Sequence, residues 1–168
     1  QAVKTAAVGV PMMRAMVIDY AEDPACLYLD RQYMLGDNLL CAPVLNEEGM
    51  AEFYLPEGVW TDIITGEEIQ GGRYVSRTCS YLEMPVLARP NSIITYGAFQ
   101  SDFEYDYLTN ATVTIYQLAD GASAQTSVYD KEANKLMDLT TERAIPSLSH
   151  IPRQPRHSEL LLPARTSA

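Results

Sequence analysis

The sequence is poor in cysteine and in positive charge, and each shortage excludes a class of function. Only three cysteines occur in 168 residues, Cys26, Cys41 and Cys79. Their spacing forms neither a disulfide framework nor a CxxC metal motif. Twelve lysines and arginines against 22 acids leave a net charge of −10. Such acidity disfavours nucleic acid as a partner, because phosphate binding requires basic clusters, and we interpret it as a contribution to solubility.

Long apolar runs and glycine-rich loops are also missing. No apolar run approaches the ~20 residues that a membrane helix needs, so we expect no membrane association. The nine glycines are scattered at turns and form no phosphate-binding loop. No secretion signal is visible near the N-terminus, and free thiols suit a reducing compartment, so we expect a cytoplasmic protein. The sequence begins without methionine, which predicts that it belongs to a longer chain.

The titratable residues form no pattern that by itself predicts a catalytic site. His150 and His157 lie in a segment that we expect to be disordered, where neither a nucleophile–base pair nor a metal site would be held in place. The acids occur in groups, but each group falls in an expected turn, cap or linker, where solvated carboxylates are common. These groups are Glu22/Asp23, Glu47/Glu48, Glu67/Glu68 and Asp102/Glu104/Asp106.

The N-terminal part predicts one β/α unit. Residues 9–18 are nearly all apolar, as in a strand that is buried on both faces of a parallel sheet. Arg14 interrupts this run and needs a carboxylate or carbonyl partner, because an unpaired buried charge is very costly. Asp23 as N-cap and Pro24 as the first helical residue predict a helix over 24–35. A single unit of this kind cannot cover its own sheet, so it needs neighbours from outside this sequence.

From residue 38 the pattern changes to short strands. Short apolar or alternating runs, separated by polar turns about every 8–12 residues, predict an antiparallel β-sandwich over residues 38–98. The six runs are 39–45, 51–55, 59–65, 73–76, 81–89 and 92–96. Four aromatic residues of this region are of the type that stacks on sugar rings, although an aromatic residue in a strand more often belongs to the core. They are Tyr54, Trp60, Tyr74 and Tyr81.

Residues 99–142 predict a linker and the beginning of a second β domain. Two strands, 112–118 and 124–129, predict a hairpin around the Asp120-Gly121 turn, and a hairpin is not stable alone. From residue 143 the composition shifts: four arginines against one glutamate give a local net charge of +3, and no aromatic residue occurs. We therefore predict a disordered or aberrant tail over 143–168.

The sequence resembles glycoside hydrolase family 31 over about residues 5–130. The resemblance rests on motifs whose order and spacing match throughout. They are Gly9–Met16 (GVPMMRAM), Asp23-Pro24, Leu29–Leu45 (LDRQYMLGDNLLCAPVL), Phe53–Asp62 (FYLPEGVWTD), Thr65–Glu67 (TGE) and Leu82–Ile94 (LEMPVLARPNSII). The first and third of these are most similar to the bacterial α-xylosidase branch of the family.

The resemblance implies a fold that is mostly β. Residues 1–37 would be the last strand and helix of a catalytic (β/α)8 barrel, and 38–98 a proximal C-terminal antiparallel β-sandwich. Residues 99–142 would form a linker and a partial distal β domain. Arg14 matches an arginine that the family carries on the last barrel strand. We expect it to be a salt-bridged structural residue near the active site, beneath its floor, and not a ligand contact.

The resemblance also implies a retaining α-glycosidase that hydrolyses terminal α-xylosidic or α-glucosidic bonds with two aspartates and no cofactor or metal. Both aspartates are expected upstream of Gln1, so no residue of this chain is assigned a catalytic role and the chain alone is expected to be inactive. The implied partner is an α-linked xylo- or gluco-oligosaccharide bound by the barrel, and the full-length protein is a candidate homo-oligomer.

Two alternatives stay open. The first is a non-catalytic β-sandwich that binds carbohydrate or another partner, and the predicted β/α unit argues against it because a binding module has no use for a lone barrel strand. The second is a pseudo-fragment that does not fold independently.

Overall fold

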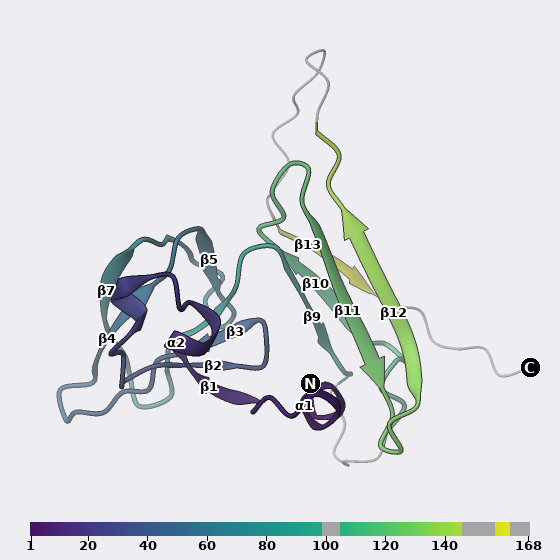
Figure 1. The fold of residues 1–168 in the computed structure, drawn as a ribbon, viewed down its shortest axis with the longest axis horizontal. Helices are drawn as coiled ribbons and strands as arrows, with labels where there is room; N and C mark the ends of the chain where they lie inside the picture. The colour runs from purple at the N-terminus through teal and green to yellow at the C-terminus, as the bar shows by residue number, and fades with distance from the viewer. Residues whose placement is uncertain (99–104, 146–156, 162–168) are drawn as a thin grey trace, which may run out of the picture. The chain divides into compact units, whose positions relative to one another are not determined.

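The computed structural model describes residues 1–98, 105–145 and 157–161 (Figure 1). It divides into two compact units, Gln1–Pro90 and Asn91–Ala168. In the described ranges no helix combines the length and the apolar character that crossing a membrane requires. Both units are built mainly of antiparallel strands, so the predicted fold is confirmed in its mostly β character.

The first unit contains a six-stranded antiparallel sheet in the order β1-β2-β3-β8-β5-β6 and a separate β4–β7 pair. Three short helical segments lie among its strands: α1 (Ala2–Val8), α2 (Met16–Asp19) and η1 (Pro24–Cys26). The larger sheet contains β1 (Met13–Ala15), β2 (Tyr33–Leu35), β3 (Leu39–Cys41), β5 (Val59–Asp62), β6 (Glu68–Gln70) and β8 (Val86–Ala88). The smaller one contains β4 (Met50–Leu55) and β7 (Arg73–Thr78).

The two sheets of the first unit share one apolar core. Leu40, Trp60 and Leu87 come from the larger sheet, and Phe53 and Leu55 come from β4; all five are buried. Side chains alternate between the two faces of a strand, so each sheet contributes one inward-facing set to this core. The arrangement is that of a β-sandwich, as the spacing of the short strands predicts.

The second unit contains two further sheets. One has the order β13-β10-β9, with β9 (Ser92–Tyr96), β10 (Thr112–Tyr116) and β13 (His157–Leu161). The other is the long pair β11 (Ser123–Tyr129) and β12 (Lys135–Glu142). Buried Ile93, Val113 and Ala124 form a small core, against which Met137 and Leu139 pack.

The predicted N-terminal β/α unit is wrong for this chain. Of the expected strand only β1 forms, and it pairs with β2 in an antiparallel ladder. Asp23 does cap a helical turn, since it accepts the Ala25 N–H at 3.0 Å, but that turn ends at Cys26. The glycine after the predicted helix, Gly36, suited a helix end, but it has φ of 61° in the turn that joins β2 to β3. This hairpin uses the last three residues of the predicted helix.

The strand pairing of 92–129 also differs from the prediction. β9 pairs along its whole length with β10, so this strand belongs to the second unit and not to the sandwich predicted over 38–98. The predicted hairpin of 112–118 with 124–129 is wrong, because β10 pairs with β9 and β13 while β11 pairs with β12. A turn signal reports only a change of chain direction, and here the turn leads from one sheet to the other.

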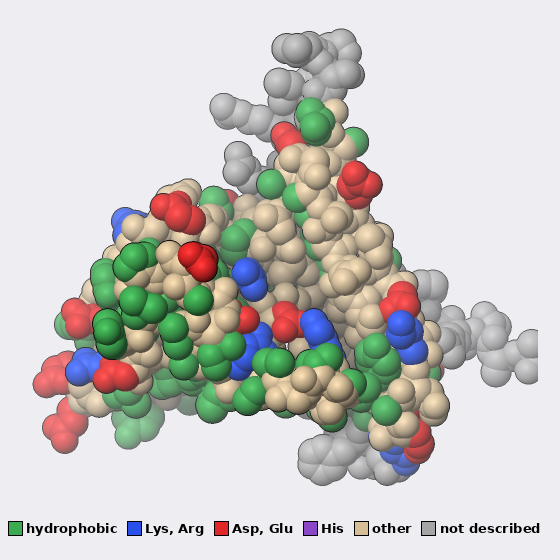
Figure 2. Space-filling view, viewed as in Figure 1, with side chains coloured by type: hydrophobic (Ala, Val, Ile, Leu, Met, Phe, Trp, Pro, Cys, Tyr) green, Lys and Arg blue, Asp and Glu red, His purple; other side chains and the backbone are tan. Residues whose placement is uncertain are grey.

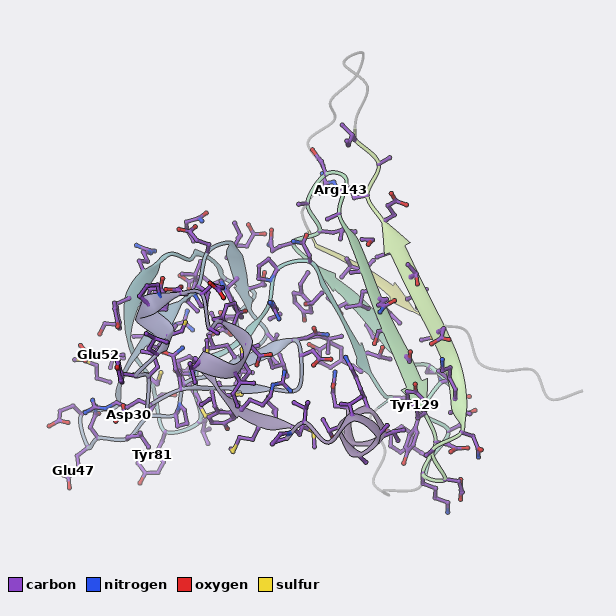
Figure 3. All side chains as sticks on the ribbon, in the orientation of Figure 1. Asp30, Glu47, Glu52, Tyr81, Tyr129 and Arg143 are labelled. Atoms are coloured by element: carbon purple, nitrogen blue, oxygen red, sulfur yellow. The ribbon has the colours of Figure 1, made fainter. Side chains whose placement is uncertain are left out.

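The disorder predicted over 143–168 does not hold for the described part of that range. His157–Leu161 pairs with β10 as an antiparallel strand. Arg143, which is labelled in Figure 3, makes an ion pair with Asp120 at 2.7 Å. The prediction rested on composition averaged over the segment, whereas a short strand joins a sheet edge through backbone hydrogen bonds. Residues 146–156 and 162–168 lie outside the described residues.

Candidate functional site

Arg14 is the centre of a polar cluster at the N-terminal edge of the first unit. Its side chain is 4% exposed and forms a bidentate ion pair with Asp19, in which Nε and Nη2 donate to the two carboxylate oxygens at 2.9 and 3.1 Å. It also donates to the carbonyl oxygens of Pro11 and Gly36, at 3.1 and 2.9 Å, and contacts Asp37 at 3.3 Å. The partners that a buried arginine needs are therefore supplied within the chain, from both sides of β1 and from the β2–β3 turn.

The electrostatics of this cluster favour a fixed charge and not proton transfer. The hydrogen bond to Asp19 raises the pKa of Arg14, although burial opposes the shift. Burial tends to raise the pKa of Asp37, but its hydrogen bond and charge contact with Lys4 and the charge of Arg14 outweigh this effect and lower it. Groups that stay ionised in this way serve as permanent ion-pair partners, so the cluster holds β1 to the β2–β3 turn and offers no acid or base.

The groups of acids do not assemble into a pair of catalytic carboxylates among the described residues. Asp23 caps η1 and accepts the Tyr54 hydroxyl at 2.9 Å, and Glu67 pairs with Arg77. Asp106 accepts the backbone N–H of Leu108 at 2.9 Å. Glu22, Glu47, Glu48 and Glu68 are exposed, and Asp102 and Glu104 lie outside the described residues. His157 lies on β13 opposite Tyr116, and His150 is not described.

One buried acid, Asp62, was not among the candidate acids identified from the sequence. Asp62, at the end of β5, is 1% exposed and accepts the backbone N–H groups of Ile64 and Thr65 at 2.8 and 2.9 Å. It also forms an ion pair with Arg77. The Asp-x-x-Thr-Gly spacing of a turn was its only local signal, and the arginine comes from a strand of the other sheet. Across the described residues, no three His, Cys, Asp or Glu side chains form a group that could hold a metal ion.

The three thiols are buried and free. Burial, assisted by the nearby Asp23, raises the pKa of Cys26 to about 11, and burial also raises the pKa of Cys41 and Cys79. At pH 8 a thiol with a pKa near 11 is about 0.1% thiolate, so its reaction with a disulfide reagent is slow.

We expect all three thiols to react within minutes in denaturant and to be strongly protected in the native protein, as measured with a chromogenic disulfide reagent. Rapid native labelling of any one of them would show that its surroundings are open.

The four aromatic residues of the sandwich region separate into two groups. Trp60 is 0% exposed and Tyr54 8%, so both belong to the core as predicted. Tyr74 is 65% exposed and Tyr81 is fully exposed, so the prediction that they belong to the core is wrong for these two residues. Tyr74 lies on the outer face of β7, and Tyr81 lies in the turn region between β7 and β8. Strand membership alone does not determine burial, because every second residue of a sandwich strand faces outward.

A groove of about 390 Å³ lies between the segment 28–32 and the β4–β7 sheet. Its lining combines exposed tyrosines, charged side chains of both signs and small polar groups. The lining residues are Tyr28, Leu29, Asp30, Arg31, Gln32, Glu52, Phe53, Tyr74, Val75 and Ser76. Asp30 and Glu52 lie on the same side of the first unit in Figure 3, and acidic side chains gather along that edge in Figure 2. We call this feature the Tyr28–Tyr74 groove.

A second hollow, of about 440 Å³, belongs to the second unit. Tyr105 and Tyr107 line it, with their rings 4.9 Å apart in an edge-on arrangement. Asp130 also lines it, but its carboxylate is occupied by the backbone N–H and the side-chain amide of Asn134. The lining of this hollow therefore offers fewer unengaged polar groups than that of the Tyr28–Tyr74 groove.

Comparison with known proteins places these units in a family. Residues 9–94, about half of the chain, match the model of the glycosyl hydrolase family 31 C-terminal domain. The chain belongs to this family, as the sequence motifs predicted. Among relatives, it is 37% identical over 142 residues to the α-xylosidase XylQ of Lactiplantibacillus pentosus, which covers 83% of this chain. It is 30% identical over 125 residues to α-glucosidase 2 of Bacillus thermoamyloliquefaciens, which covers 74% of it.

Solved structures give the same result. A family 31 α-xylosidase from Xanthomonas citri aligns with a TM-score of 0.66 and 29% identity, over 76% of this chain and 14% of that one. A family 31 dextranase from Flavobacterium johnsoniae aligns with a TM-score of 0.75 over 85% of this chain and 19% of that one. Its identity of 22% supports the fold alone. The chain spans less than a fifth of the length of the relatives described here.

Proposed function

We propose that this chain is the C-terminal β region of a retaining α-glycosidase that hydrolyses terminal α-xylosidic or α-glucosidic bonds. The observation that carries the proposal is the family match over 9–94, extended by 37% identity to an α-xylosidase over 142 residues. The extended alignment covers 83% of the chain, so the similarity also includes part of the second unit. An α-glucosidase among the relatives supports the second substrate class.

The two catalytic carboxylates are assigned to a barrel that precedes Gln1 in the full-length protein. In retaining glycosidases one carboxylate attacks the anomeric carbon while a second protonates the leaving oxygen, and water then releases the sugar. Among the described residues, half-buried Asp19 is engaged by Arg14 and buried Asp62 by Arg77. These contacts support a structural role for both acids, and we place Arg14 beneath the active-site floor of the full-length protein as a structural residue.

The proposal also covers the cellular location, the substrate and the oligomeric state of the full-length protein. Three buried free thiols support a reducing, cytoplasmic location. The substrate is an α-linked xylo- or gluco-oligosaccharide, and the full-length protein is proposed to assemble as a homo-oligomer.

One specific observation favours a carbohydrate-binding role as a second candidate function: the Tyr28–Tyr74 groove presents two exposed aromatic rings beside charged side chains.

The test compares the full-length protein with residues 1–168 alone on nitrophenyl α-xyloside and nitrophenyl α-glucoside. We expect the full-length protein to release nitrophenol from at least one of the two substrates and the 168-residue chain to release it from neither. The β-linked isomers serve as matched control substrates and are expected to stay intact. Full-length protein that is inactive on both α-glycosides would overturn the proposal, and turnover by the 168-residue chain would overturn the assignment of the catalytic groups to the barrel.

A further inference from the structure

One wall of the Tyr28–Tyr74 groove is the β4–β7 ribbon. Glu52, Tyr54, Tyr74 and Ser76 share one face of the β4–β7 ribbon, because Glu52 lies opposite Ser76 and Tyr54 opposite Tyr74. Phe53 and Val75, between them, pack in the core and also contribute to the groove lining, whereas Tyr54 is buried and does not line the groove. The exposed part of this face consists of Glu52, Tyr74 and Ser76.

Tyr74 is held in place from below. Its ring lies 5.1 Å from the ring of Tyr54, at an interplanar angle of 56°. Tyr54 is itself fixed, because its hydroxyl donates to Asp23 at 2.9 Å and its backbone exchanges two hydrogen bonds with the side chain of Gln32, at 2.7 and 2.8 Å. Tyr74 therefore presents an exposed ring to solvent and packs on one side against a fixed neighbour.

The opposite wall is also anchored while its side chains stay exposed. Leu29 packs against the core and Gln32 is buried, so the segment between them follows a defined path. Tyr28, by contrast, is 91% exposed. Tyr28 and the exposed Tyr74 both line the groove, and exposed aromatic side chains that line one hollow are a feature of binding sites.

The charged side chains of the groove are available to a ligand. None of the ion pairs or side-chain hydrogen bonds found among the described residues involves Asp30, Arg31 or Glu52. Two carboxylates and one guanidinium give the groove a local charge of −1, which disfavours phosphates and other anions. The same groups supply acceptors and donors for hydroxyls, and an aromatic face offers an apolar surface to the C–H face of a pyranose ring.

We propose that the Tyr28–Tyr74 groove binds a neutral α-linked gluco- or xylo-oligosaccharide, with Tyr74 and Tyr28 stacking on sugar rings and Asp30, Arg31 and Glu52 bonding to hydroxyls. The choice of sugar rests on the proposed function of the whole protein, whereas the groove itself rests on the geometry above. Its volume of about 390 Å³ lies within the ~300–1,000 Å³ that is usual for small-ligand sites.

The test uses full-length protein whose catalytic site is kept saturated with a monosaccharide inhibitor. The probes are sulfur-linked isomaltotriose and sulfur-linked α-xylosyl-(1→6)-glucose, both of which resist hydrolysis, and binding is measured by calorimetric titration. We expect saturable binding of at least one probe, weakened about tenfold by Tyr74→Ala and by Tyr28→Ala because each removes a stacking ring. Tyr74→Phe keeps the ring and is expected to bind like the unaltered protein.

Tyr81→Ala is the matched control, since Tyr81 is an exposed tyrosine of the same unit that does not line the groove. Equal affinity in the Tyr74→Ala, Tyr28→Ala and Tyr81→Ala variants, or no binding of either probe, would overturn the proposal. Activity on the nitrophenyl α-glycosides separates the two claims. Activity without groove binding overturns the groove alone, and groove binding without activity overturns the proposed function and supports the groove.

Discussion

Trp60→Ala is expected to destabilise the first unit by about 3–5 kcal/mol, the range observed when a large buried aromatic residue is truncated. Trp60 is 0% exposed, and its indole N–H donates to the carbonyl oxygen of Pro56 at 2.9 Å. Its ring lies 6.4 Å from that of Tyr20, over which the guanidinium of Arg89 is placed at 5.0 Å. The substitution therefore creates a cavity and leaves the Pro56 carbonyl without this donor.

The measurement is denaturant unfolding followed by circular dichroism, because Trp60 is the single tryptophan and its fluorescence is lost in the variant. Tyr81→Ala, at a fully exposed position, provides the comparison and should change the free energy of unfolding by no more than about 0.5 kcal/mol. Equal stability of the two variants would contradict the placement of Trp60 at the centre of the core.

Arg14→Met is expected to cost about 3–5 kcal/mol, because it leaves Asp19 without its bidentate partner and the Gly36 carbonyl without a donor. Methionine has a similar length, so most of the effect comes from the lost charge and hydrogen bonds. Arg31→Met is the matched control: Arg31 is exposed, and the substitution should change the free energy of unfolding by no more than about 0.5 kcal/mol.

Acid unfolding gives a second readout of the Arg14 cluster. The pKa of Asp37 is lowered in the folded protein, so its ionised form contributes stability above the pKa of the unfolded chain, and this contribution is lost as pH falls through the lowered folded pKa. Removing Arg14 removes part of that lowering. The difference in stability between the unaltered protein and Arg14→Met should therefore be largest near neutral pH and shrink in acid. A difference that does not change with pH would contradict the ion-pair account.

Local patterns predicted the strands of the sandwich well. β4, β5 and β7 each overlap a run that alternates or is apolar between turn residues, and such runs need no knowledge of the partner strand. Pairing was harder to predict, because it depends on distant residues. The partner of β9 is β10, which begins 16 residues after β9 ends, and nothing in Ser92–Tyr96 distinguishes the sheet of the first unit from that of the second.

The helix predicted over 24–35 failed for a related reason. Cys26, Leu29 and Tyr33 lie at helical spacing, but three such residues are a weak signal. Tyr33–Leu35 instead pairs with β1 and β3, and a short, exposed helix would be marginal without such partners. For Arg14, the cost of burying a charge was enough to predict a carboxylate or carbonyl partner, but not which ones. The Tyr28–Tyr74 groove could not be predicted from the sequence, because the exposure of Tyr74 and the burial of Tyr54 depend on the register between β4 and β7.

The measurement that tests the central claim most directly is the anomeric form of the first sugar released by the full-length protein. Proton NMR of nitrophenyl α-xyloside or α-glucoside during the first minutes of hydrolysis separates the α- and β-anomers before they interconvert. A retaining family 31 glycosidase releases the α-anomer first, and that is the predicted result. Release of the β-anomer first, or no hydrolysis of either substrate, would contradict the account.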